Sequence, residues 1–97
     1  MMQKITKQPL IGVSQLVATP GALAALEKTG QSPVEFLARH VAGDWGELLV
    51  EDQTENLLSV ERGFRVFSSY RTSAGDRIWI ITEGDRSLTT LLLPDEY

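Results

Sequence analysis

Apolar residues recur at helical spacing in three segments of the first two thirds of the chain. The segments are TPGALAALEKTG, QSPVEFLARHVAG and EDQTENLLSVERG, at 19–30, 31–43 and 51–63. In the first two, Thr19 and Ser32 can cap a helix, and the prolines that follow fit its first turn. Each segment ends at a glycine, the residue that most easily takes the left-handed conformation of a helix stop. The pattern predicts three short helices.

The last third of the chain has the composition of β-strands. Residues 64–70, 77–83 and 87–93 are FRVFSSY, RIWIITE and SLTTLLL, rich in β-branched and aromatic residues. The short connections between them indicate hairpins, so we expect an antiparallel meander with 77–83 in the middle. Residues 10–18, LIGVSQLVA, are a candidate additional strand, and residues 1–9 are expected to be frayed.

These elements predict the fold class α+β, with three short helices packed on one face of a three-stranded antiparallel sheet. Because 97 residues suit one small domain, we expect a single domain spanning 1–97. Hydrophobic residues make up 42% of the chain and charged residues 23%, a balance that allows a buried core.

Strand alternation divides the predicted sheet into two apolar faces. The first hairpin is expected to pair Arg71 with Arg77, and the second to pair Glu83 with Ser87. On that register the face toward the helices carries Phe64, Val66, Tyr70, Ile78, Ile80, Leu88 and Leu92. The opposite face, here called the Trp79 face, carries Phe67, Trp79, Ile81 and Leu91, surrounded by Arg65, Arg71 and Arg77.

The seven residues of the Trp79 face are the candidate partner-binding residues. Monomers seldom leave such a patch bare, and tryptophan with arginine is typical of interface hot spots. Residues 10–17, a second copy of the chain or another protein would each cover it. The expected partner is therefore a protein, or a second copy in a homodimer, bound through the Trp79 face.

Composition and charge exclude several classes of protein. The absence of cysteine rules out a disulfide scaffold, a thiolate zinc site and a cysteine nucleophile, and it fits a cytoplasmic protein. No apolar run approaches the roughly 20 residues of a membrane helix, and no signal peptide is evident, so no membrane association is expected. A net charge of −4 argues against nucleic acid as a partner. The sequence predicts no cofactor.

The middle of the chain is acidic. Six acids and no base lie between positions 44 and 61, namely Asp44, Glu47, Glu51, Asp52, Glu55 and Glu61. Such a run is most often a solvated helix face, and the alternative is a docking surface for a basic partner.

The stretch RHVAGDWGEL, residues 39–48, holds the only histidine, His40, four residues before Asp44. Gly43 is expected to end the helix between them, and no nucleophile or metal-ligand set accompanies the pair, so we predict no catalytic and no metal-binding residues. We expect a structural anchor, in which Trp45 pins the bend, His40 packs or caps and Asp44 bonds backbone amides. The alternatives are an exposed, partner-binding Trp45, and a small hydrolase or nuclease that uses His40 with Asp44 or Glu83.

Two stretches, VATPGALAALEKTGQSPVEFLARHVAGDWGEL and IWIITEGDRSLTTLLLPDEY, together carry a family resemblance. They resemble a family of short bacterial proteins labelled hypothetical or plasmid-related, from about Gly12 to Tyr97. The resemblance implies a setting in accessory or mobile DNA, and it assigns no activity to any residue. We therefore expect a small cytosolic protein-interaction module of a host-defence or plasmid-maintenance system, with the hydrolase or nuclease as the alternative.

Overall fold

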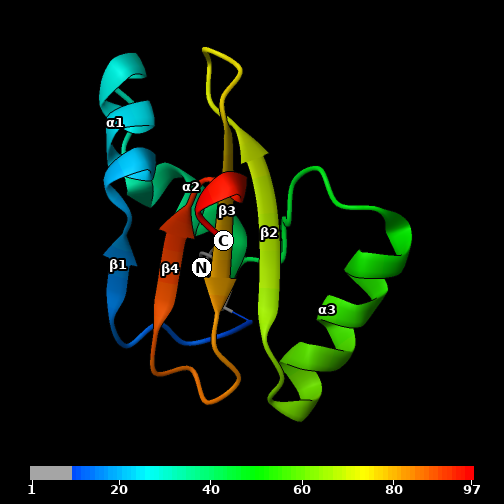
Figure 1. The fold of residues 1–97 in the computed structure, drawn as a ribbon. Coiled ribbons are helices and arrows are strands. Elements are labelled where there is room, and N and C mark those ends of the chain that lie inside the picture. The colour runs from blue at the N-terminus through cyan, green and yellow to red at the C-terminus, as the bar shows by residue number, and fades with distance from the viewer. Residues whose placement is uncertain (1–9) are drawn as a thin grey trace, which may run out of the picture.

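The sheet of this protein is four-stranded and mixed (Figure 1). The computed structural model describes residues 10–97, so the prediction for residues 1–9 lies outside the described residues. Its elements are β1 (Leu16–Ala18), α1 (Pro20–Thr29), α2 (Pro33–Val41), α3 (Val50–Arg62), β2 (Val66–Arg71), β3 (Arg77–Thr82), β4 (Thr89–Leu92) and the 3-10 helix η1 (Pro94–Glu96). The predicted α+β class and the three helices are confirmed.

The prediction of a three-stranded antiparallel sheet is wrong in detail, because β1 adds a parallel strand. The strand order is β1-β4-β3-β2, and Leu16 and Ala18 pair with Thr89 and Leu91. Consecutive strands reveal their pairing through short turns, whereas β1 meets β4 about seventy residues later and leaves no local signal. The candidate strand at 10–18 is thus real only over its last three residues.

One of the two predicted registers is correct. Arg71 lies opposite Arg77 and Phe67 opposite Ile81, as expected. Between β3 and β4, however, Trp79 lies opposite Leu92 and not Leu91. Leu91 consequently points to the other face and is fully buried in the core, so its assignment to the Trp79 face is wrong.

The physical cause of this shift lies in the second hairpin turn. The amide of Glu83 donates to the carbonyl of Leu88 at 2.9 Å, so Glu83 pairs one residue later than Ser87. The longer turn is possible because Arg86 takes a positive φ of 65°, a conformation that non-glycine residues seldom adopt. The Arg86 guanidinium offsets that strain by donating to the carbonyls of Phe64 and Ser59 at 2.7 and 2.9 Å.

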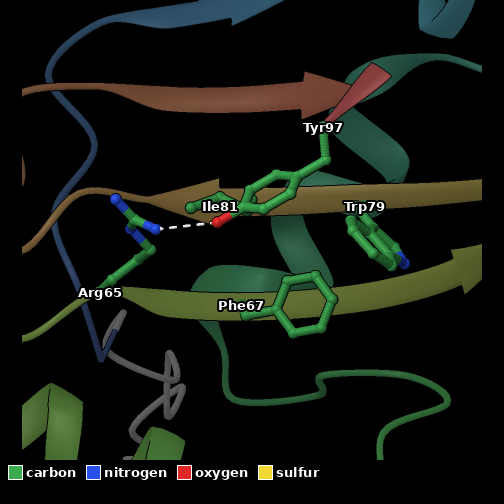
Figure 2. Close-up of a pocket in the computed structure, with 5 residues that line it drawn as sticks. All are labelled: Arg65, Phe67, Trp79, Ile81 and Tyr97. Carbon is green, nitrogen blue, oxygen red and sulfur yellow. Dashed lines mark hydrogen bonds between the residues drawn. The ribbon is translucent and has the colours of Figure 1, made fainter. Parts of the chain in front are cut away.

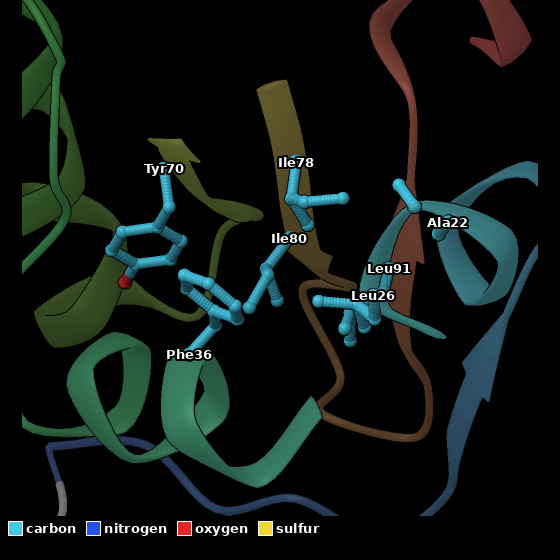
Figure 3. Close-up of a cluster of buried hydrophobic side chains, with 8 residues drawn as sticks. Ala22, Leu26, Phe36, Tyr70, Ile78, Ile80 and Leu91 are labelled. Atoms are coloured by element: carbon cyan, nitrogen blue, oxygen red, sulfur yellow. The ribbon is translucent and has the colours of Figure 1, made fainter. Parts of the chain in front are cut away.

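The main core lies between α1, α2 and one face of the sheet (Figure 3). Small residues of α1 let the helix approach the strands closely, and Phe36 of α2 packs on Tyr70 with ring centroids 5.5 Å apart. The buried cluster consists of Ala22, Ala25, Leu26, Phe36, Tyr70, Ile78, Ile80 and Leu91. Both helices therefore cover the face opposite Trp79.

Helix α3 lies along the free edge of β2 and not over the centre of the sheet (Figure 1). The side-chain amide of Asn56 donates to the carbonyl of Phe67 at 2.6 Å, and the Phe67 amide donates to the Asn56 oxygen at 3.1 Å. Further along the edge, Gly46 forms a parallel bridge with Ser69. A side-chain amide and a bend thus occupy backbone groups that an open sheet edge would offer to another chain.

The first prediction concerns this edge. Replacing Asn56 with alanine leaves the half-buried Phe67 amide and carbonyl without their partners, so we expect Asn56→Ala to lower the free energy of unfolding by about 1–3 kcal/mol. Urea denaturation measures the change, with Glu55→Ala on the exposed side of the same helix as control. Equal stability of the two variants would contradict the role given to Asn56.

Candidate functional site: the Trp79 face

The Trp79 face contains an open groove of about 290 Å³ between β2, β3 and the C-terminal residue (Figure 2). We call it the aromatic groove, and its lining residues are Arg65, Phe67, Trp79, Ile81 and Tyr97. Register explains the arrangement, because Phe67 of β2 pairs with Ile81 of β3, and Trp79, two residues before Ile81, points to the same face of the sheet. The three aromatic rings come from β2, from β3 and from the residue that follows η1.

The aromatic rings of the groove contact one another edge to face. The centroids of Phe67 and Trp79 are 4.9 Å apart at 88°, and those of Trp79 and Tyr97 are 5.8 Å apart at 71°. Edge-to-face pairs are the favoured arrangement of such rings, and each stabilises the other's position. Tyr97 remains 72% exposed, so its ring forms a wall of the groove and leaves the groove open.

Arg65 supplies the cationic group of the groove. Its guanidinium donates to the Tyr97 hydroxyl at 3.2 Å (Figure 2). It also donates to Glu83 Oε1 at 3.2 Å. The Tyr97 ring is therefore held at its hydroxyl end as well as through its contact with Trp79. This ion pair is exposed to solvent, so it positions the side chains more than it stabilises the fold.

The neighbouring residue Glu96 also helps to position Tyr97. One carboxylate oxygen of Glu96 accepts hydrogen bonds from the Thr19 hydroxyl and from the Leu93 amide, and the other accepts from the Gly21 amide at 3.1 Å. Hydrogen bonding, first from Thr19, lowers the pKa of Glu96 below its ordinary value. The carboxylate also lies at the N-terminus of α1, where the helix dipole favours negative charge. The chain end is thereby fastened beside the sheet.

The other two arginines predicted for this face lie beyond the groove. Arg71 and Arg77 both bind Glu47 Oε1, at 3.0 and 3.2 Å, so one carboxylate serves two guanidinium groups. This pairing, first with Arg71, lowers the pKa of Glu47. Arg77 also borders a second hollow, of about 340 Å³, on the far side of Trp79, whose walls include Leu48.

Four of the seven predicted partner-binding residues therefore meet at the aromatic groove, namely Arg65, Phe67, Trp79 and Ile81. Leu91 does not, and its place opposite Trp79 belongs to Leu92. Of the three covers considered for this face, residues 10–17 are ruled out, because β1 extends the sheet beside β4 and Ile11 packs with Trp45 and Val66. Tyr97 was missed, since a single turn of 3-10 helix after Pro94 has no periodicity to reveal it.

His40 is fully buried and lies between the helix α2 and the sheet. Its Nδ1 lies 2.5 Å from Ser68 Oγ and its Nε2 2.9 Å from Thr82 Oγ1, which in turn lies 2.8 Å from Thr89 Oγ1. A neutral imidazole satisfies both contacts, because one ring nitrogen donates and the other accepts. Burial, with a smaller contribution from the positive charge of Arg86, lowers the pKa of His40 to about 4.

The residues of the enzyme alternative do not assemble around His40. Asp44 binds Arg39 through two hydrogen bonds of 2.7 and 3.3 Å, and Glu83 binds Arg65. The imidazole makes its hydrogen bonds with hydroxyl groups and has no exposed surface. It is therefore placed to hold α2 to the strands and not to meet a substrate.

Trp45 lies in a second core cluster with Ile11 and Val66 and is only 7% exposed. The bend around it is tied to β2, because the Asp44 carbonyl accepts the Tyr70 hydroxyl at 2.6 Å. Gly46 is required by space and by conformation. Its φ is 72°, and a Cβ there would lie 2.0 Å from the Ser69 carbonyl oxygen. The tryptophan between two glycines thus fills the core while the chain passes close to the sheet edge.

The second prediction uses the pKa of His40. The His40 imidazole takes up a proton near pH 6.5 in the unfolded chain and only near pH 4 in the folded protein. The contribution of His40 to the free energy of unfolding is therefore fully present above pH 6.5. It is lost as the pH is lowered toward about 4, by about 3 kcal/mol in total. Urea denaturation at several pH values measures this slope. His40→Gln should remove it between pH 6.5 and 5.5, because the chain has no other histidine; an unchanged slope would contradict the assignment.

The third prediction concerns Glu96. Because its pKa is lowered in the folded protein, its contacts persist above the ordinary carboxylate pKa and weaken as the pH falls through the folded value. Glu96→Ala should release Tyr97 from Trp79 at neutral pH. Acrylamide quenching of Trp79 fluorescence in a Trp45→Phe background should rise, with the exposed Asp95→Ala as control. Unchanged quenching would show that Glu96 does not position Tyr97.

The chemistry available elsewhere is limited. Among residues 10–97 no three His, Asp or Glu side chains gather as metal ligands would, and no helix is long and apolar enough to cross a bilayer. No family model, no curated protein and no solved structure matches this chain in comparisons with known proteins. The aromatic groove is consequently interpreted from its own geometry.

Proposed function

We propose that this protein is a protein-interaction module whose partner docks in the aromatic groove. The observation that carries the proposal is the set of three aromatic rings beside Arg65 on the sheet face opposite α1 and α2. Tryptophan, tyrosine and arginine are the residues that contribute most to binding energy at protein interfaces. The groove offers all three around one opening of about 290 Å³.

The chemistry of the groove favours an apolar side chain of a protein over a polar small molecule. Besides the indole N–H of Trp79, its polar side-chain groups are the Arg65 guanidinium and the Tyr97 hydroxyl, and these two already bond to each other. Small-molecule sites usually occupy about 300–1,000 Å³ and present several free polar groups. The groove is at the lower limit of that range, which suits one or two apolar side chains.

Other parts of the functional hypothesis rest on the sequence alone. A cytoplasmic location and a host-defence or plasmid-maintenance setting stay predictions, the second implied by the family resemblance. The hydrolase or nuclease alternative has less support, because it needs an accessible His40 and that residue is fully buried. A homodimer through the Trp79 face is the competing form of the interaction proposal.

The fourth prediction tests the groove directly. The tagged chain is used to capture proteins from its host, and the affinity of the captured protein is then measured with purified variants. Trp79→Glu should weaken binding at least about tenfold, because burying a carboxylate at the interface costs more free energy than the contacts of that carboxylate return. Leu23→Glu, at a half-exposed position of α1, is the matched control and should bind normally.

Folding and self-association are controlled in the same experiment. Tyr97→Asp places a charge at the largely exposed wall of the groove and should weaken binding without unfolding the chain. Light scattering reports the oligomeric state, and a dimer that becomes a folded monomer in both groove variants would assign the groove to self-association. Full binding by both folded variants would refute a role for the groove.

A further inference from the structure

Helix α3 carries its apolar and polar residues the opposite way round from an ordinary surface helix. Its buried residues are Asn56 and Ser59, both polar. Val50, Leu57 and Leu58 are instead 75, 59 and 45% exposed. A helix of a globular domain normally turns its apolar stripe toward the core. The exposed apolar residues of α3 therefore contribute little to folding.

Polar contacts hold α3 in place without using those residues. Asn56 bonds the β2 backbone, and the Arg86 guanidinium donates to the Ser59 carbonyl near the end of the helix. Of the helix's apolar residues, half-buried Val60 packs against the second core cluster. The outer side of the helix is thus left free while its inner side is firmly attached.

The outer side forms two neighbouring rows by helical spacing. One row contains Glu51, Glu55, Leu58 and Arg62, and the next contains Val50, Thr54, Leu57 and Glu61. At the C-terminal end, Leu58 borders a hollow of about 270 Å³ together with Phe64, which is also largely exposed. Apolar residues and carboxylates thus share one continuous surface, here called the outer face of α3.

The carboxylates of this surface are not neutralised by the described part of the chain. Glu51, Glu55 and Glu61 form no ion pair with any of residues 10–97, whereas Asp44, Glu47 and Glu83 each bind an arginine. The only base of the helix is Arg62, in its last turn. The outer face therefore combines an apolar strip with an unbalanced negative charge.

We propose that the outer face of α3 docks a basic amphipathic helix of another protein. Its apolar side would cover Val50, Leu57 and Leu58, and its lysines or arginines would lie beside the carboxylates of α3. Charge complementarity selects this partner. A second copy of the chain would bring two acidic surfaces together, and nucleic acid would meet negative charge. This surface lies apart from the aromatic groove, and the inference does not rest on the proposed function.

The probe is a synthetic peptide of about 18 residues, with leucine and lysine at helical spacing so that it forms one apolar and one basic side. Fluorescence anisotropy with the full chain should show saturable binding that weakens as salt screens the charges. The same peptide with glutamate in place of lysine should not bind. Equal binding of both peptides would overturn the charge argument.

Apolar variants locate the binding surface. Leu57→Gln with Leu58→Gln should weaken the lysine peptide about tenfold or more, because the apolar strip is lost while helix propensity is kept. The matched control is Leu23→Gln with Val34→Gln, two exposed apolar positions on α1 and α2. Circular dichroism verifies that both double variants are folded. Equal weakening by the two pairs would overturn the proposal.

Charge variants test the carboxylates separately. Glu51→Gln with Glu55→Gln should weaken binding and reduce its salt dependence, whereas Glu27→Gln with Glu35→Gln on α1 and α2 should leave both unchanged. The chain's own first nine residues carry Lys4 and Lys7 and no acid. If the peptide binds only after both lysines are changed to glutamine, this segment already occupies the surface, and the proposal of a separate partner is overturned.

Discussion

The central strand β3 is apolar on both sides, and the rest of the structure follows from that constraint. Ile78 and Ile80 require a cover on one face of the sheet, and Trp79 and Ile81 require one on the other. Helices α1 and α2 provide the first cover completely. The second is provided by neighbouring side chains and the ring of Tyr97, which leaves a groove. The functional proposal therefore arises where the covering of β3 is incomplete.

Polar side chains fix the elements that apolar packing leaves loose. Glu96 fastens the chain end to the start of α1, Asn56 fastens α3 to β2, and Arg86 joins α3 to the turn between β3 and β4. Inside the core, His40 joins α2 to β2 and β3 through two hydroxyl groups. Each of these side chains satisfies backbone or buried polar groups, so each specifies one arrangement as well as stabilising it.

The sequence predicts the elements whose signals are local. Caps at Thr19 and Ser32 and left-handed glycines at positions 30 and 63 mark helix ends where they occur, and a short hairpin sets the register of β2 with β3. The same reasoning fails where a distant residue, or a residue with an unusual backbone conformation, sets the pairing of a strand. The positive φ of Arg86 shifts β4 by one residue and turns Leu91 into the core.

The aromatic groove was likewise predictable only in the part that depends on local signals in the sequence. Alternation along β2 and β3 brings Phe67, Trp79 and Ile81 together, because that register is local. Tyr97 joins them through its edge-to-face contact with Trp79 and through the contacts made by Glu96 and Arg65, and none of these leaves a periodic signal in the sequence. The buried state of His40 likewise depends on hydroxyl groups from two strands, 28 and 42 residues further along the chain.

The two candidate surfaces differ in whether their charged side chains form ion pairs. On the Trp79 face, the one arginine of the aromatic groove, Arg65, is paired with Glu83, so burial of the groove would depend mainly on apolar area and little on salt. On α3, the described residues leave Glu51, Glu55 and Glu61 unpaired, so attraction there would extend further into solvent and weaken as salt rises. The apolar residues of α3 take little part in the core, and its attachment through Asn56 and Arg86 is polar. Selection on that surface could therefore change a partner without changing the fold.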